Sequence, residues 1–128
     1  VREAGSVYFI GDAEYKEGEQ FNGGGFRNVP GEKEWGAVRA YNPLTGEMKW
    51  EHRLFTPPWS GLLSTAGNLV FGGTNEGQVF ALQASTGKPL WRFQAGGPAR
   101  SNPMSYTVDG KQYVALAMGN SLYVFALE

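Results

Sequence analysis

The feature that most restricts the fold of this chain is an internal repeat. The segment GAVRAYNPLTGEMKWEHRL (36–54) aligns with GQVFALQASTGKPLWRFQA (77–95), so that Gly36 falls on Gly77, a spacing of 41 residues. A Thr-Gly turn and the tryptophan that follows it coincide in the two copies. A repeat of this length is typical of one β-propeller blade. A third, truncated copy occupies 120–128.

Each copy predicts a strand, a turn and a returning strand. In GQVFALQA (77–84) apolar residues lie on both faces, which favours a strand covered on both sides. Gly87 is free to adopt a positive φ in the turn, and Pro89, which lacks an N–H donor, suits the start of an outer strand. No stretch shows helical periodicity with capping residues. Further strands are predicted at 62–65, 68–73, 101–108, 111–119 and 121–127, with Asp109-Gly110 as a hairpin turn.

Composition agrees with a packed β-protein and excludes several classes. The chain has 128 residues, of which 41% are hydrophobic and 14% aromatic, and a formal net charge of −1. This charge gives no electrostatic reason to expect a nucleic acid or an anionic membrane as partner. The absence of cysteine excludes disulfides and thiolate metal sites. No apolar run approaches the roughly 18 residues that span a bilayer.

The N-terminal part, 1–34, differs from the repeats in 35–128. VYFIG at 7–11 predicts one strand of a partial blade, and 12–34 predicts a long, Gly-rich and charged loop. Its acidic residues lack the alternating oxygen ligands of a calcium loop, so we expect a solvated loop. The start of the chain, without an initiator Met, suggests a processed product or a piece of a longer protein. The acidic residues are Asp12, Glu14, Glu17 and Glu19.

Trp50 and Trp91 have an expected structural role. Each indole can pack between adjacent blades while its N–H donates to a carbonyl, and the Thr-Gly turn fixes the register in which the indole arrives. His52, the single histidine, follows Trp50 on the same strand and is expected to be a surface residue.

The predicted fold is therefore all-β, with antiparallel four-stranded blades of a partial β-propeller. The strands suffice for about two to three blades. Because propellers have at least four blades, a chain of this length is expected to be a fragment, an open stack or one part of an assembly.

These residues carry a resemblance to a known family. AYNPLTGEMKW (40–50) and ALQASTGKPLW (81–91) resemble the tryptophan-docking motif of the quinoprotein alcohol dehydrogenases, which use pyrroloquinoline quinone (PQQ). PPWSGLLSTAGNLVFGGTNEGQVFALQASTGKPLWRF (57–93) is similar to the penultimate part of those enzymes, and GGPARSNPMSYTVDGKQYVALAMGNSLYVFAL (96–127) resembles their C-terminal end.

The resemblance implies an eight-bladed propeller with PQQ and a Ca²⁺ or lanthanide ion on its axis. It also implies oxidation of a small alcohol to an aldehyde in the periplasm, with hydride transfer to metal-bound PQQ and electrons passed to a cytochrome or the quinone pool. The rest of the propeller would then be the partner of this chain.

Two residues carry over as cofactor-binding candidates. Trp59, in PPWSG, matches a family tryptophan beside PQQ, and Asn120, in MGNSL, lies where the last blade approaches the cofactor. Methanol-dehydrogenase-like members have a longer Gly-rich loop at the latter place, so other branches match more closely. The family's metal ligands, catalytic aspartate and adjacent cysteine pair belong to earlier blades. We therefore expect no catalytic or metal-binding residue here, and no activity or bound cofactor in the chain alone.

Two alternatives remain open from sequence. One is a non-catalytic propeller scaffold that mediates protein–protein interaction, as in outer-membrane assembly factors with similar blades. Trp59 in PPWSG distinguishes the enzyme from the scaffold, because such a scaffold does not need it. The other is a small stand-alone protein that self-associates through exposed blade edges.

Overall fold

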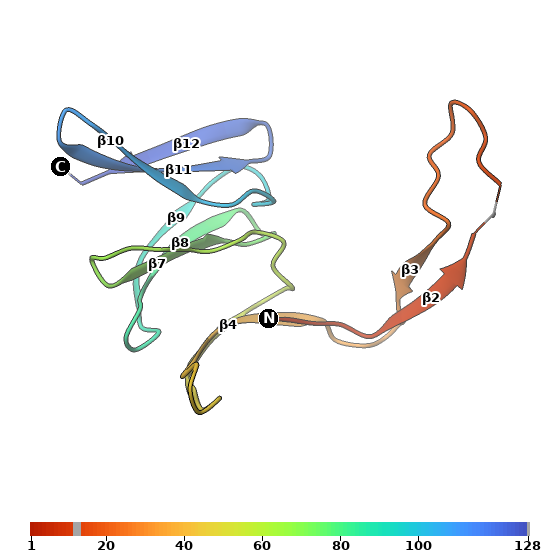
Figure 1. Ribbon diagram of the computed structural model, residues 1–128, viewed down its shortest axis with the longest axis horizontal. Coiled ribbons are helices and arrows are strands. Elements are labelled where there is room, and N and C mark those ends of the chain that lie inside the picture. Colours follow the sequence, from red (N-terminus) through yellow and green to blue (C-terminus); the bar gives the residue numbers. More distant parts are fainter. Residues whose placement is uncertain (12–13, 128) are drawn as a thin grey trace.

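The protein folds into β-strands joined by turns and loops. The computed structural model describes residues 1–11 and 14–127, and in these residues there are twelve strands in four antiparallel sheets, and no helix (Figure 1). It follows that the described chain has no helix long and apolar enough to cross a membrane. The strands are β1 (Arg2–Glu3), β2 (Ser6–Ile10), β3 (Gly24–Asn28), β4 (Trp35–Tyr41), β5 (Met48–Leu54), β6 (Leu63–Ser64), β7 (Leu69–Gly73), β8 (Gln78–Gln83), β9 (Pro89–Gln94), β10 (Met104–Val108), β11 (Lys111–Met118) and β12 (Ser121–Ala126).

Three of the sheets correspond to blades. The second blade is complete, with the strand order β6-β7-β8-β9. The first blade, β1-β4-β5, lacks the equivalent of β6, and the third blade, β10-β11-β12, lacks the equivalent of β9. The predicted all-β, antiparallel organisation with two to three blades is therefore confirmed.

The two Thr-Gly turns have the same hydrogen bonds. Gly46 N donates to Asn42 O and Gly87 N donates to Gln83 O, both at 2.8 Å. The two glycines have φ angles of 71° and 73°, as their place in the turns requires. In each turn the threonine hydroxyl also accepts a backbone N–H at 3.3 Å, from Glu47 and from Lys88. The sequence repeat is therefore a repeat of backbone geometry.

In the part of the chain that the structure describes, the core consists of two clusters, each between a pair of blades. Between the first and second blades, Phe80 and Leu82 of β8 pack with Val38 and Leu54. Between the second and third blades, Val79 packs with residues of β11 and of the 95–103 segment. Phe80 and Val79 are neighbours on β8 and face opposite sides of the sheet, so β8 is covered on both faces, as its apolar pattern predicted. The second cluster contains Val79, Ala95, Ala99, Leu116 and Met118.

The N-terminal part departs from the prediction. The strand expected at 7–11 exists as β2, but it pairs only with β3 and belongs to no blade. β3 lies inside the segment predicted to be a loop, where glycines argued against a strand. The ring of Phe9 packs across the backbone of its pairing partner Gly25, with Cζ 2.8 Å from where a Cβ would lie. Phe9 therefore covers β3 at a position where glycine provides no side chain.

The hairpin of β2 and β3, called the arm below (residues 6–28), projects away from the three blades (Figure 1). It is inserted between β1 and β4, which pair with each other in the first blade. Arg2 of β1 pairs with Gly36 of β4. The two-residue strand β1 thus precedes the arm, and the other strands of the first blade, β4 and β5, follow it.

Candidate functional site

One edge of the blades collects most of the connections and both cofactor-binding candidates. It comprises the inter-blade segments 55–62 and 95–103 and the turns 74–77 and 119–120, and is called the connection edge below. Antiparallel order brings these segments together, because the four-stranded second blade begins and ends at this edge, the first blade ends there and the third blade begins there. Direct contacts confirm it, since Ala99 N donates to Thr74 O and Gly119 N donates to Pro98 O, both at 3.0 Å.

The two inter-blade segments are themselves equivalent, and they bind each other. Ser60 falls 41 residues before Ser101, and its hydroxyl donates to Ser101 O at 3.0 Å. The Ser101 hydroxyl in turn donates to Ala117 O at 2.9 Å and accepts from Ala117 N at 3.0 Å. Gly61 lies against Asn102, whose Oδ1 is 2.1 Å from where a Cβ would be placed. The connection edge is thus a continuous hydrogen-bonded layer over the second and third blades.

Trp59 is placed at this edge by glycine in the neighbouring strand. A Cβ on Gly36 would lie 2.3 Å from Cδ of Pro58, so only glycine lets the Pro57-Pro58 segment lie on β4. Asn75 Nδ2 donates to Pro57 O at 2.9 Å and holds the segment from the second blade. The Trp59 side chain is 52% exposed. An aromatic surface is therefore available at the connection edge.

Arg2 covers part of Trp59. Its guanidinium carbon lies 4.2 Å from the centre of the Trp59 ring and 5.7 Å from that of Phe26 on the arm. Cation–π contacts of this kind fix the relative orientation of the groups. Among the described residues, two buried side-chain polar atoms have no hydrogen-bond partner, Arg2 Nε and Asn75 Oδ1. Both belong to residues that contact the 57–59 segment.

Asn120 lies at the same edge but in another place. It forms the turn between β11 and β12 and is exposed. It lines a shallow hollow together with Arg100 and Ser101, and Trp59 is not among the residues of this hollow. The structure thus brings both candidates to one edge without joining them in one pocket. The hollow is lined by Pro98, Arg100, Ser101, Ala117, Gly119 and Asn120.

Two titratable groups near the blade contacts have shifted pKa values. For Glu76, in the 74–77 turn, burial acts to raise the pKa, but hydrogen bonds from the Thr56 and Thr74 hydroxyls outweigh it and lower the pKa. The Thr56 hydroxyl lies 2.5 Å from Glu76 Oε1. Burial lowers the pKa of His52, which is half-buried beside Phe80, their ring centres being 6.1 Å apart. His52 is thus less exposed than the sequence suggested.

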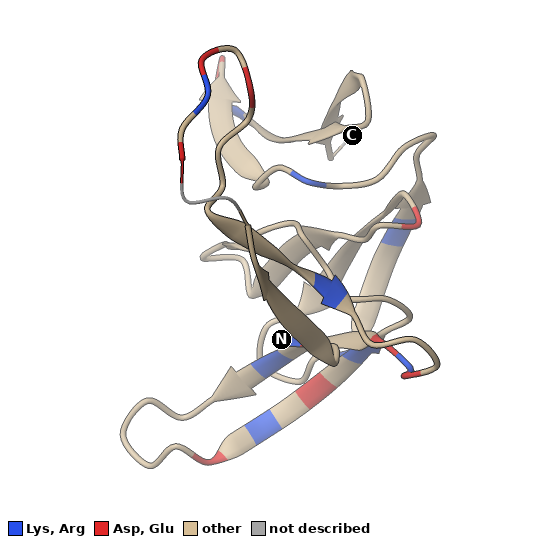
Figure 2. Ribbon diagram, turned by 90° about the vertical axis from the view of Figure 1, so that its right-hand side faces the viewer, with Lys and Arg blue, Asp and Glu red and all other residues tan. Residues whose placement is uncertain are grey.

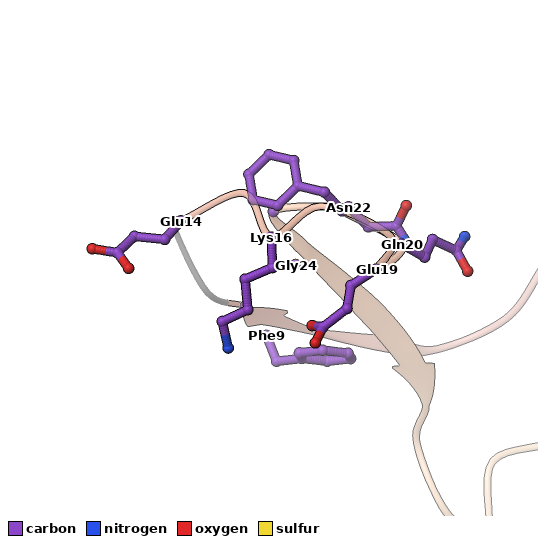
Figure 3. A pocket seen from close by; sticks show the side chains of 10 residues that line it. Phe9, Glu14, Lys16, Glu19, Gln20, Asn22 and Gly24 are labelled. Carbon is purple, nitrogen blue, oxygen red and sulfur yellow. The ribbon is translucent and has the colours of Figure 1, made fainter.

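The acidic loop of the arm offers no metal site in its described part. Figure 3 shows the hollow at the arm tip, where Glu14 points outward and Lys16 lies between it and Glu19. Of the predicted acidic cluster, Asp12 lies outside the described residues. No group of three or more His, Cys, Asp or Glu side chains in residues 1–11 and 14–127 could hold a metal ion.

Comparison with known proteins identifies the family. A family model described as "Outer membrane protein assembly factor BamB" matches residues 34–128. The chain belongs to this PQQ_2 family. It is 42% identical to quinoprotein alcohol dehydrogenase PedE of Pseudomonas putida strain KT2440 over 113 residues, which cover 88% of this chain and 18% of PedE. It is 40% identical to subunit 1 of methanol dehydrogenase [cytochrome c] of Methylobacterium organophilum, with 82% and 18% covered.

Solved structures agree. A europium-containing methanol dehydrogenase matches with a TM-score of 0.71 and 32% identity over 91% of this chain and 21% of its own. BamB from Moraxella catarrhalis matches with a TM-score of 0.53 at 18% identity over 100% of this chain and 36% of its own, which shows a shared fold. The homologues of this chain are thus quinoprotein alcohol dehydrogenases, and the sheets of this chain are part of a β-propeller. The chain spans about a fifth of the length of the curated relatives it matches.

The aromatic surface at the connection edge fits a planar quinone. Trp59 offers a half-exposed ring there, and the Arg2 guanidinium covers part of it. Sequence reasoning found Trp59 and Asn120 but missed Arg2. An arginine at the second residue of a chain belongs to no recognisable motif, and only the pairing of β1 with β4 brings it to Trp59.

Proposed function

We propose that this chain is one part of the propeller of a PQQ-dependent alcohol dehydrogenase, which oxidises a small alcohol to an aldehyde. The observation that carries the proposal is the 42% identity to PedE over 88% of the chain. The 128-residue chain contributes blades and part of the cofactor wall, and it is not catalytic by itself. The remainder of the propeller is its obligatory partner.

In this proposal Trp59 and Asn120 bind the cofactor from two places on the connection edge. Trp59 supplies an aromatic surface, and Asn120 an exposed amide on the turn of the third blade. PQQ held with Ca²⁺ or a lanthanide ion would supply the hydride acceptor for oxidation of the alcohol. The europium-containing methanol dehydrogenase supports the choice of a lanthanide as one candidate ion.

The site of the reaction and its acceptor follow from the same relationship. The methanol dehydrogenase relative is named for cytochrome c, which supports a cytochrome as the electron acceptor, with the quinone pool as the alternative. Periplasmic location completes the proposal, because the family resemblance implies it.

Trp50 fits the tryptophan-docking motif, since its indole Nε1 donates to Ala84 O of the next blade at 2.9 Å.

A chimaera tests the function. Residues 1–128 replace the matching segment of PedE, and the purified protein is supplied with PQQ and either Ca²⁺ or a lanthanide. We expect alcohol-dependent reduction of a dye by this chimaera. The matched control carries the same segment with Gly61→Val, which places a side chain against Asn102 and disrupts the connection edge.

The outcome distinguishes enzyme from scaffold. A chimaera that folds, as judged by its circular dichroism and melting temperature, but neither binds PQQ nor oxidises alcohol would contradict the proposal. The alternative, a scaffold for protein–protein interaction, is favoured by the description of the family model that matches residues 34–128. The lower identity to BamB, 18%, makes it the second candidate.

Self-association through a blade edge is a separate proposal for the chain alone. The outer strand β5 carries alternating charges, Lys49, Glu51 and Arg53, which discourage edge pairing (Figure 2). The edge strand β12, with the sequence SLYVFA, carries no charge. We expect light scattering to show concentration-dependent association that Val124→Lys reduces. Gln112→Lys, on the central strand β11, is the matched control and should leave association unchanged, and a clean wild-type monomer would contradict the proposal.

A further inference from the structure

The tip of the arm carries an asparagine that is followed by a glycine. Of the seven asparagines in the chain, only Asn22 has this neighbour, Gly23. Both residues are exposed and lie outside β2 and β3, and Asn22 lines the hollow at the arm tip (Figure 3). Within the described chain, neither the Asn22 amide nor the Gly23 backbone N–H forms a hydrogen bond. An amide carbon and the nitrogen that follows it are therefore both open to reaction.

Other asparagines of the chain are restrained or lack that nitrogen. Asn68 Oδ1 accepts from Ser85 N at 3.0 Å, and its Nδ2 donates to the Ser85 hydroxyl at 3.1 Å, so the blade holds this amide from both ends. Asn42 and Asn102 precede proline, whose nitrogen has no proton to lose. At Asn22 the next residue has no Cβ that would hinder the approach of its nitrogen to the side chain.

We propose that Asn22 is a modification site, at which water converts the side-chain amide to a carboxyl group. The Gly23 nitrogen loses its proton to solvent base and bonds to Asn22 Cγ. The bond from Cγ to Nδ2 breaks, and the side-chain nitrogen leaves as ammonia. Water then opens the resulting succinimide ring at either carbonyl and yields aspartate or isoaspartate. The change consumes one water, releases one ammonia and needs no oxidant, reductant or cofactor.

The conversion alters the arm in two ways. A carboxyl group at position 22 is ionised at neutral pH and adds a negative charge to the acidic loop. Isoaspartate also adds a carbon to the backbone directly before Gly23, whose carbonyl accepts from Gly11 N at 3.2 Å. This bond lies at the tip end of the arm, next to the pairing of Ile10 with Gly24. The site thus changes the charge and pairing of the arm tip and leaves the blades intact.

The test follows the 128-residue chain, folded and in urea, during incubation in mildly alkaline buffer. Peptide mapping by mass spectrometry gives the rate of amide loss at each asparagine, and an isoaspartate methyltransferase labels the isoaspartate formed. Gly23→Ala introduces a Cβ where the structure has open space. Gly18→Ala is the matched control, because Gly18 also has a positive φ and open space in the same loop but does not follow an asparagine. Circular dichroism checks that each variant folds.

We expect Asn22 to be converted first, at a rate in the folded chain within about tenfold of its rate in urea, since the fold does not restrain it. Gly23→Ala should slow the conversion about tenfold or more, because its side chain hinders the nitrogen, and Gly18→Ala should not change it. A folded-chain rate more than about tenfold below that in urea would overturn the inference, because the arm would then protect Asn22. Equal rates in the wild type and Gly23→Ala would also overturn it, since the reaction would then not pass through the Gly23 nitrogen.

Discussion

Trp50 and Trp91 occupy the same position in successive repeats, yet their surroundings differ. The Trp50 indole lies over Gly87 in the turn of the next blade, donates to Ala84 O and packs on the cluster of Phe80 and Leu82. Trp91 is 39% exposed and contacts the third blade through Phe125, with ring centres 5.0 Å apart. In the described residues, the Trp91 indole nitrogen has no hydrogen-bond acceptor.

The difference shows that the motif acts between repeats and not within one. The strand, the turn and the tryptophan form with the same geometry in both copies, since the turn bonds repeat. Docking additionally needs the Thr-Gly turn of the following blade, and this chain contains no third such turn after Trp91. The turn around Gly46 is the converse case, because in the described residues no heavy atom beyond its two chain neighbours lies within 4 Å of a Cβ placed there.

Removal of each indole gives the largest expected contrast. Trp50→Ala should lower the free energy of unfolding by about 3–4 kcal/mol, because it empties a packed inter-blade contact. Trp91→Ala should cost about 1–2 kcal/mol, since less of that side chain is buried. Urea denaturation followed by circular dichroism measures both. Equal losses of unfolding free energy would show that the two indoles are equally docked, and would contradict the difference between Trp50 and Trp91.

Substitution of the turn glycines tests the other half of the contact. Gly87→Ala should cost about 3 kcal/mol, because its Cβ would lie 2.5 Å from Trp50 Cε3 and its φ is positive. Gly46→Ala has a matching φ but open space, and should cost only about 1 kcal/mol from backbone strain. Thermal melts of the two variants provide the measurement. A Gly46→Ala variant as unstable as Gly87→Ala would mean that backbone strain, not the indole, dominates.

The indole hydrogen bond should have a smaller effect. Trp50→Phe keeps most of the apolar surface and removes the donor to Ala84 O, so we expect a loss of about 1 kcal/mol. Trp91→Phe removes a donor that has no acceptor in the described chain, and should be close to neutral. The midpoints of urea denaturation decide between these values. A neutral Trp50→Phe would assign the Trp50 contribution to packing alone.

The smallest effect concerns pH. Position 52 in the first repeat corresponds to position 93 in the second. His52 lies beside Phe80, and Phe93 lies beside Phe125. Because burial lowers the pKa of folded His52 below 6.5, its neutral form is preferred in the fold. Its stabilising contribution is therefore present above pH 6.5 and is lost as pH falls through the folded pKa. His52→Phe should flatten the slope of unfolding free energy in this range, whereas Phe93→Leu should leave it unchanged, as denaturation over a pH series would show.

Most of the blade structure was predictable because it is local. Alternation of apolar residues, Asp109-Gly110 at a hairpin and the Thr-Gly turns specify strands and turns within a few residues of each other. The arm was not predictable in the same way. Its glycines argue against a strand, and the packing of Phe9 over Gly25 that compensates for them is known only once the two strands pair.

The candidate site divides along the same line. Trp59 and Asn120 were found through family resemblance, and their place at the connection edge agrees with a shared role that remains a prediction. Arg2 was missed because its contact with Trp59 depends on the pairing of β1 with β4 across the whole arm. A contact of that kind leaves no periodic or motif signal in the chain.

The sequence by itself determined the class of secondary structure, the repeat and the family, because each is written in patterns that span fewer than about 45 residues. Only the tertiary structure decided which tryptophan is docked, which strands complete a blade and which cation lies beside Trp59. These depend on which surfaces meet after the chain folds, and the free energy of such contacts is set by packing and desolvation between segments distant in sequence.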